Sequence, residues 1–139
     1  MQPVMDTDSE TLLHEGIATG QAAFAKFMPA AGWTREQIDR TVCHQVGSRH
    51  RTLMLQSLGL ELEKDHATFP WTGNTGSVAL PITLADAAHR QVVRPGDRVA
   101  LLGIGSGINS VMAAVQWQET IVVGNLPEFT AATDASDLP

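Results

Sequence analysis

Short apolar runs alternate with longer segments of helical spacing along this chain of 139 residues. The runs Thr41-Val42-Cys43 and Val99-Ala100-Leu101-Leu102 are typical of buried strands. Residues 108–117 can pair back on the second run as a hairpin partner, although a helix is the competing interpretation there. Helix, strand, helix, strand, helix and then two strands is the order of an α/β protein with crossover connections. We therefore expect a layered mixed sheet with helices on its faces.

Helix-start signals define the first third of the chain. Thr7 and Glu10 have the spacing of a capping box, and the apolar residues after them predict a helix that ends before Pro29. Thr34 and Gln37 repeat the same spacing, which predicts a short helical turn that leads into the first strand.

Two further helices are expected downstream. Ser48–Leu58 is followed by Gly59, a residue typical of helix ends, and residues 77–92 are rich in Ala and Leu, with Pro81 tolerable near the first turn. Between these helices we expect a short strand near Thr68-Phe69. After residue 117 a β-prone patch at 121–123 gives way to a polar end, which we expect to be mobile.

Composition excludes several classes of function. The net charge is −6, and one short basic stretch, Arg49-His50-Arg51, is too little for a nucleic-acid surface. A single cysteine cannot form an internal disulfide, so a cytoplasmic location is expected. No apolar run reaches the roughly 18 residues of a membrane span, and the acidic start does not fit a signal peptide. The charged fraction of 17% is low, which suggests that a partner covers part of the surface.

Three polar loops carry the functional signal: Cys43-His44-Gln45, Gly73-Asn74-Thr75-Gly76 and Gly103-Ile104-Gly105-Ser106-Gly107. A His and an Asn can both donate hydrogen bonds to one thioester oxygen, and a glycine-rich turn can offer backbone N–H groups to a second oxyanion. Together these groups resemble half of an active site, in which a nucleophile is missing.

Each of these residues also has a simpler interpretation. A lone His44 could be a structural residue, and Asn74 alone could be a turn residue. The glycine run is similar to a dinucleotide-binding fingerprint, but Ile108 stands where the last glycine should be. Cys43 should be buried filler, because adjacent residues on a strand point to opposite faces and Cys43 could then not share a pocket with His44. The other histidines lack the spacing of metal ligands, so no metal site is predicted.

The third loop is preceded by the turn Arg94-Pro95-Gly96-Asp97 and the strand 99–102. With this turn included, the order and spacing of the three motifs resemble the C-terminal half of a thiolase-fold condensing enzyme of the ketoacyl synthase III type. The run Leu102-Gly103-Ile104-Gly105-Ser106-Gly107-Ile108-Asn109 is similar to the branch that joins two fatty acyl thioesters head to head in olefin and β-lactone pathways. The resemblance divides the chain into a half-domain over residues 1–117 and an extension over residues 118–139 that should be partly mobile.

The resemblance also implies roles for individual residues. In this family a cysteine accepts an acyl group, and a His and an Asn, matched here by His44 and Asn74, bind the carbonyl of the second substrate as it becomes an enolate. Gly105, Ser106 and Gly107 would form the second oxyanion loop. Arg49 would lie at the pocket mouth and contact a carrier protein or a coenzyme A phosphate, although it could equally be a solvated helix residue.

The resemblance leaves out the half that bears the nucleophilic cysteine. We therefore expect an acyltransferase subunit that catalyses Claisen condensation only within a hetero-oligomer, with a cysteine-bearing thiolase-like chain or half as its partner. Its substrates would be acyl-CoA or acyl carrier protein thioesters, with no cofactor and no metal. The alternative is a catalytically degenerate subunit that serves as a scaffold or a regulator.

Overall fold

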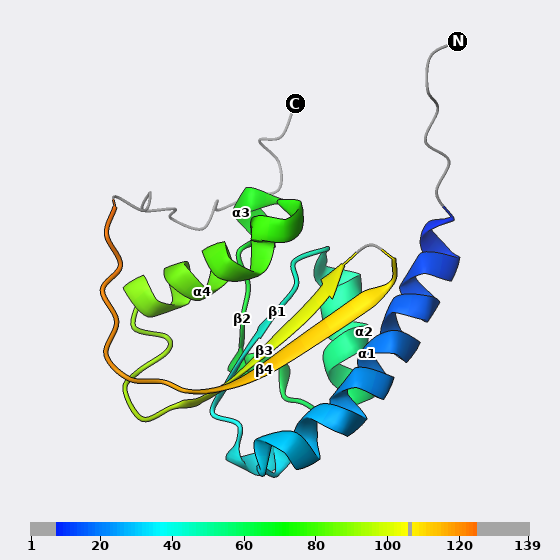
Figure 1. Cartoon of the computed structure of the whole chain (residues 1–139). Coiled ribbons are helices and arrows are strands. Elements are labelled where there is room, and N and C mark those ends of the chain that lie inside the picture. The colour runs from blue at the N-terminus through cyan, green and yellow to red at the C-terminus, as the bar shows by residue number, and fades with distance from the viewer. Residues whose placement is uncertain (1–7, 106, 125–139) are drawn as a thin grey trace.

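The computed structural model describes residues 8–105 and 107–124, which form a mixed four-stranded sheet with helices on both faces (Figure 1). The strands are β1 (Arg40–Cys43), β2 (Asp65–His66), β3 (Arg98–Gly105) and β4 (Asn109–Gln116), in the order β2-β1-β3-β4. The helices are α1 (Ser9–Ala31), α2 (Ser48–Leu58), α3 (Phe69–Thr72) and α4 (Ala79–His89). The expected fold class, a layered α/β sheet, is confirmed.

The two longest strands form the hairpin that the glycine run predicts. β1 lies parallel to both β2 and β3, whereas β3 and β4 are antiparallel and pair from Arg98 with Gln116 to Gly105 with Asn109. The competing helix over residues 108–117 is therefore wrong. Side chains of β4 alternate between exposed and partly buried over most of its length, which is the period of a strand.

The first helix begins and ends later than predicted. Thr7 lies outside the described residues, and the cap is Asp8, whose Oδ1 accepts hydrogen bonds from the backbone N–H groups of Glu10 and Thr11. α1 continues past Pro29 to Ala31, and Gly32 ends it with a φ of 67°. The prediction that Pro29 stops the helix is wrong, because a proline in the last turn removes one hydrogen bond while the buried Phe24 and Phe27 hold that turn on the sheet.

The segment between α2 and α4 also differs from prediction. The strand is Asp65–His66 and not Thr68-Phe69, because Asp65 is paired with Thr41 of β1 while Phe69 begins α3. The helix predicted over residues 77–92 is shorter, with a 3₁₀ turn at Gly76–Val78 before α4. In contrast, α2 has the predicted bounds with Gly59 in the left-handed conformation, and the turn at Arg35–Gln37 has the predicted capping box.

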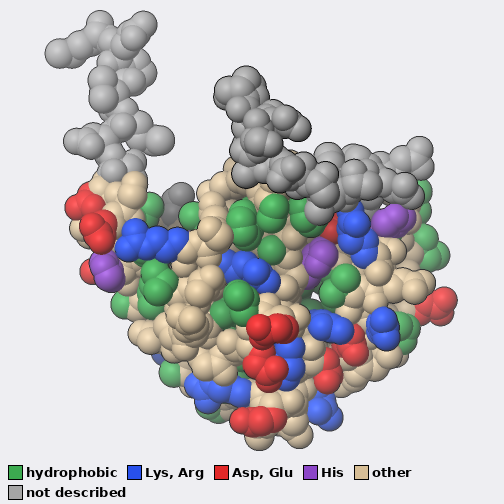
Figure 2. Space-filling view, turned by 180° about the vertical axis from the view of Figure 1, so that it is seen from behind, with side chains coloured by type: hydrophobic (Ala, Val, Ile, Leu, Met, Phe, Trp, Pro, Cys, Tyr) green, Lys and Arg blue, Asp and Glu red, His purple; other side chains and the backbone are tan. Residues whose placement is uncertain are grey.

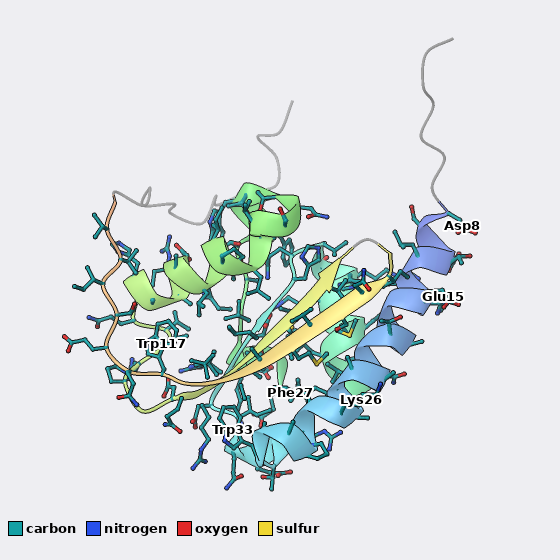
Figure 3. All side chains as sticks on the ribbon, viewed as in Figure 1. Asp8, Glu15, Lys26, Phe27, Trp33 and Trp117 are labelled. Atoms are coloured by element: carbon teal, nitrogen blue, oxygen red, sulfur yellow. The ribbon has the colours of Figure 1, made fainter. Side chains whose placement is uncertain are left out.

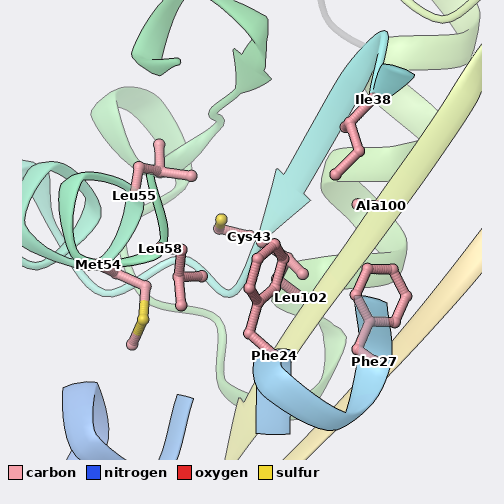
Figure 4. Close-up of a cluster of buried hydrophobic side chains, with 9 residues drawn as sticks. All are labelled: Phe24, Phe27, Ile38, Cys43, Met54, Leu55, Leu58, Ala100 and Leu102. Atoms are coloured by element: carbon pink, nitrogen blue, oxygen red, sulfur yellow. The ribbon is translucent and has the colours of Figure 1, made fainter. Parts of the chain in front are cut away.

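Each face of the sheet has its own hydrophobic cluster. On one face α1 and α2 pack over a cluster that includes Phe24, Leu55 and Leu102 (Figure 4). The exposed Glu15 and Lys26 extend from the other side of α1 (Figure 3). On the opposite face α4 packs over a smaller cluster of Val42, Ala87, Val93 and Val99.

The surface charges and the helices can be compared with two predictions from composition, the absence of a nucleic-acid surface and the absence of a membrane span. Figure 2 shows Lys and Arg side chains interspersed with Asp and Glu over the face in view, and not gathered into one continuous basic surface. Within residues 8–105 and 107–124, no helix is long and apolar enough to cross a lipid bilayer.

Candidate functional site

Three parallel strands bring the three predicted loops to one edge of the sheet. β1 ends at Cys43 and is followed at once by His44, and β3 ends at Gly105 within the glycine run. β2 ends at His66 and leads through α3 to the loop of residues 73–76. The carboxyl ends of parallel strands are the usual position of sites in α/β proteins. The candidate site is therefore the α3 end of the sheet in Figure 1.

His44 extends the pairing of β1 by one residue, since its backbone N–H donates to the carbonyl oxygen of Leu102 at 2.9 Å. Its half-buried side chain lines a small hollow together with His50 of α2. Burial lowers the pKa of His44, and burial together with the charge of His44 lowers the pKa of His50. Both imidazoles are thus neutral at pH 7, and a neutral imidazole can donate one hydrogen bond to a substrate oxygen.

The remaining walls of this hollow are mostly apolar and include Met54, Leu102 and Met112. Cys43 lines it too, so the prediction that Cys43 and His44 cannot share a pocket is wrong. Both side chains line the hollow even though the backbone of His44 continues the pairing of β1, so strand alternation does not separate them here. The thiol still has the expected structural character: Cys43 is 4% exposed, and burial and the nearby Asp65 raise its pKa well above the usual value. It remains a protonated thiol within the core.

Gln45 joins the end of β1 to the start of α3. Its side chain is 2% exposed, and its Nε2 donates to the carbonyl oxygen of Cys43 at 2.7 Å. Its Oε1 accepts from the backbone N–H groups of Thr68 at 3.0 Å and Phe69 at 3.2 Å. The sequence places Gln45 beside His44 but carries no signal for this contact, because its partners lie 23 and 24 positions away.

Asn74 lies on the exposed loop between α3 and α4. Its Oδ1 accepts from the backbone N–H of Gly76 at 3.0 Å, which is the hydrogen bond of an Asx turn. This contact occupies the carbonyl end of the carboxamide, so the NH₂ group is the end that can donate to a substrate. The turn interpretation and the donor role of Asn74 are therefore compatible, and the donor role stays a prediction.

The glycine run forms the turn of the β3–β4 hairpin. Gly107 has a φ of 130°, and a Cβ there would lie 2.5 Å from Nδ2 of Asn109, so only glycine fits at this position. Gly105 is the last residue of β3 and pairs with Asn109. Ser106, whose N–H is the predicted oxyanion donor, lies outside the described residues. The oxyanion role of this loop stays a prediction.

The two arginines of the basic stretch have different environments. Arg49 is exposed and faces Glu10 across 3.8 Å, with side chains 74% and 73% exposed, a contact of little energetic value. Arg51 instead donates to Oδ2 of the buried Asp65 at 2.6 Å and to the carbonyl oxygen of Leu62 at 3.0 Å. Arg51 therefore holds α2 to β2 and adds no positive charge to the surface around Arg49. The carrier-binding role of Arg49 stays a prediction.

Two buried carboxylates, which no sequence pattern singles out, hold the elements around the site. Burial raises the pKa of Asp65, although its hydrogen bonds from Arg51 and Thr41 oppose the shift. Asp86 of α4 accepts from Nε of Arg90 at 2.9 Å and contacts Nε2 of His66 at 2.7 Å. Among residues 8–105 and 107–124 there is no group of three His, Cys, Asp or Glu side chains placed to hold a metal ion.

Comparison with known proteins gives a consistent result. Residues 28–117 match the model of the family described as 3-oxoacyl-[acyl-carrier-protein] synthase III C terminal. The chain is 42% identical over 113 residues to an acyl-CoA:acyl-CoA alkyltransferase of Shewanella oneidensis, which covers 81% of this chain and 32% of that protein.

Solved structures agree with these matches. The crystal structure of Xanthomonas campestris OleA with bound lauric acid and lauroyl-CoA aligns with a TM-score of 0.76 at 40% identity, covering 80% of this chain and 33% of that one. The structure of 3-oxoacyl-(acyl carrier protein) synthase III from Pseudomonas aeruginosa aligns with a TM-score of 0.78 at 20% identity, covering 87% of this chain and 40% of that one. At this identity the match supports the fold alone. The chain spans about a third of the length of the curated relatives that it matches.

Proposed function

The chain belongs to the family of the C-terminal region of 3-oxoacyl-[acyl-carrier-protein] synthase III, and on that premise we propose that it is the oxyanion-binding part of a condensing acyltransferase. The proposed substrates are two acyl thioesters, with acyl-CoA favoured over acyl carrier protein. The name of the Shewanella oneidensis relative and the lauroyl-CoA bound to Xanthomonas campestris OleA support this choice. The reaction would be a Claisen condensation that needs neither a cofactor nor a metal.

The observation that carries the proposal is the link between His44 and the Asn74 loop through Gln45. His44 is half-buried and neutral beside a hollow with apolar walls, as an N–H donor to a thioester oxygen should be. In the proposed reaction the imidazole of His44 and the NH₂ of Asn74 donate to the carbonyl oxygen of the second thioester and stabilise the enolate. A backbone N–H of the loop over residues 105–107 would stabilise the oxyanion at the first acyl group.

The nucleophile would come from outside this chain. Cys43 is the only cysteine in the sequence, and its buried, protonated thiol cannot attack a thioester. In the proposed sequence a partner's thiolate attacks the first thioester, whose own sulfur leaves as a thiolate. A base of the partner then removes a proton from the α-carbon of the second thioester, which forms the enolate. The enolate carbon of the second thioester then attacks that acyl carbonyl, so a carbon–carbon bond forms and the partner's thiolate is released.

The outer side of α4 supports the existence of such a partner. α4 packs its inner side on the sheet, yet its outer side also carries apolar residues, with Ile82 38% exposed and the preceding Val78 46% exposed. Val111 of β4, on the same face of the sheet, is 75% exposed. Apolar groups of this kind are usually covered in an assembly. We assign the covering surface to a thiolase-like, cysteine-bearing chain or half, which makes the functional unit a hetero-oligomer.

The same proposal includes the division of the chain, the contact for the thioester carrier and the cellular location. Residues 1–117 would be the thiolase-like half and residues 118–139 an extension, in keeping with a family match that ends at residue 117. Arg49 is the proposed contact for a carrier protein or a coenzyme A phosphate. The cytoplasm remains the proposed location, since a single buried cysteine requires no oxidising compartment. A degenerate scaffold subunit is the alternative function.

Purification of the tagged chain from its native cells tests the proposal. We expect a thiolase-like, cysteine-bearing chain to co-purify, and the complex to condense lauroyl-CoA. His44→Ala and Asn74→Ala should each lower kcat by about 100- to 1,000-fold, the usual cost of one oxyanion donor, without loss of assembly.

The matched control is Arg49→Ala, which should raise KM for the thioester without changing kcat, because Arg49 would contact the carrier and not the reacting carbonyl. Unchanged kcat in both His44→Ala and Asn74→Ala would point to the scaffold function. An active chain that sediments as a monomer would contradict the need for a partner.

A further inference from the structure

We infer that Gln45 is a positioning residue that holds the loop bearing Asn74 in register with the strand end bearing His44. The inference rests on the proposed function of these two side chains, and it assigns Gln45 a role that its buried position alone does not suggest. Gln45 would act through its neighbours, without contact with the substrate.

The start of α3 depends on Gln45. Thr68 is the N-cap residue of α3 but makes no side-chain cap hydrogen bond. The first backbone N–H groups of a helix need an acceptor, which a nearby side chain usually supplies. Here Oε1 of Gln45 accepts from both Thr68 and Phe69, so the acceptor comes from the other strand end.

A chain of hydrogen bonds continues from α3 to the residue before Asn74. The carbonyl oxygen of Thr68 accepts from Oγ1 of Thr72 at 2.9 Å, and the same hydroxyl lies 3.2 Å from the carbonyl oxygen of Gly73. Oγ1 of Thr68 also contacts Oγ1 of Thr83 of α4 at 2.6 Å, and both threonines are buried. The backbone of α3 is thus fixed to β1 on one side and to α4 on the other.

The other end of Gln45 is equally constrained. Its Nε2 donates to the carbonyl oxygen of Cys43, the residue directly before His44. One planar carboxamide therefore contacts the backbone on both sides of the site, through three hydrogen bonds within a buried, low-dielectric environment. Misplacement of a catalytic group by about 1 Å can cost about 100-fold in rate, so this geometry should control turnover.

Two substitutions of similar size separate the contacts. Gln45→Met removes all three hydrogen bonds, whereas Gln45→Glu keeps an acceptor for Thr68 and Phe69. Ile38→Val is the stability control, because Ile38 is buried before the start of β1, at the end of the strand away from His44. Amide hydrogen exchange is measured on the full chain. The kcat and KM for lauroyl-CoA are measured on the complex purified from native cells.

Gln45→Met should lower the protection of the Thr68 and Phe69 amides and of the loop over residues 73–76 at least tenfold. It should lower kcat by about 10- to 100-fold while KM changes less than about threefold, because position and not binding is lost. Gln45→Glu should keep the amide protection and recover most of kcat. Ile38→Val should lower the melting temperature with kcat within twofold of wild type.

Three results would overturn the inference. The first is a kcat within twofold of wild type in the Gln45→Met complex while His44→Ala abolishes turnover. In that case Gln45 has no positioning role, and the proposed function of His44 still stands. The second is an equal loss of kcat in Ile38→Val, since the effect would then be general destabilisation. The third is unchanged amide protection of residues 73–76 in Gln45→Met, which would show that Gln45 does not hold this loop. If His44→Ala keeps full turnover, the proposed function fails, and this exchange measurement still tests the role of Gln45 separately.

A second variant decides the question if Gln45→Met does not fold. Thr83→Val keeps the shape of the side chain and removes the hydroxyl that contacts Thr68. A lower kcat with KM unchanged would support the positioning role, and kcat within twofold of wild type would overturn it.

Discussion

The two faces of the sheet are stabilised by different kinds of contact. On the α1–α2 face nine buried hydrophobic residues form one cluster, with aromatic rings of Phe24 and Phe27 5.7 Å apart. On the α4 face the buried cluster has four members, and a polar network of His66, Asp86 and Arg90 lies beside it. Arg90 also lies 5.6 Å from the ring of Trp71. The first face has the larger hydrophobic cluster, whereas on the second a smaller cluster lies beside this polar network.

β4 shows the difference within one strand. Met112 packs against the cluster beneath α1 and α2. Val111 points to the α4 face and is 75% exposed, whereas Val115, on the same face of β4, packs against the cluster beneath α4. A Cβ on Gly103 would lie 3.7 Å from Leu80 of α4. On the α4 face, β4 is thus covered beside Val115 and exposed at Val111, which is where the proposed partner would dock.

The largest effect on stability is expected on the α1–α2 face. Phe24→Ala removes a ring that is 2% exposed and should lower the free energy of unfolding by about 3–5 kcal/mol, through lost burial and the cavity left behind. Urea unfolding of the full chain measures it. Phe24→Leu should cost much less. A loss below about 1 kcal/mol for Phe24→Ala would show that this face is not the principal core.

An intermediate, pH-dependent effect is expected on the α4 face. Burial alone would raise the pKa of Asp86, but hydrogen bonds from His66 and Arg90 outweigh it and bring this pKa below 3.8. Asp86→Asn should lower the free energy of unfolding by about 1.5–3 kcal/mol at pH 7, since a neutral carboxamide replaces the charged acceptor that faces Arg90 and His66.

The sign of the pH dependence follows from the lowered pKa. A carboxylate with a lower pKa in the folded state stabilises the fold above the unfolded value and loses this contribution as pH falls through the folded pKa. The gap between wild type and Asp86→Asn should therefore narrow below pH 3.8. Urea unfolding between pH 2 and pH 7 measures the gap, with the exposed Glu15→Gln as control. A constant gap would contradict the role of charge on this face.

The smallest effect on stability is expected at the uncovered edge. Val111→Lys should change the free energy of unfolding by no more than about 0.5 kcal/mol, because the side chain is already exposed. It should nevertheless prevent co-purification of the partner, since a charge would be buried at the interface. Leu12→Lys, an exposed apolar site on α1, is the matched control. Loss of the partner in Leu12→Lys and not in Val111→Lys would reassign the docking surface to the α1–α2 face.

Sequence patterns predicted elements whose signals are local. α2 has a stop at Gly59, and the turn at Arg35–Gln37 has a capping box, so neighbours within four positions determine both. The hairpin of β3 and β4 is equally local. The strand at Asp65–His66 was not predictable, because its formation depends on pairing with β1 and on a carboxylate bonded to Thr41. The same holds for α1 beyond Pro29.

The candidate site divides in the same way. His44, Asn74 and the glycine run were recognisable as residues, because their chemistry and order resemble one enzyme family. Their environments were not, since burial, and with it the lowered pKa of His44, exists only in the folded chain.

The sequence by itself determined the layered α/β class, the family and the residue types that could bind a thioester oxygen, because periodicity and motif order are properties of neighbouring positions. Only the tertiary structure decided that Gln45 joins the end of β1 to the start of α3, that Arg51 faces inward and that Val111 stays exposed on the α4 face. The first two depend on contacts between residues far apart in the sequence, such as Arg51 with Asp65, 14 positions away, and Gln45 with Thr68, 23 positions away, and the local pattern does not contain the energies of such contacts.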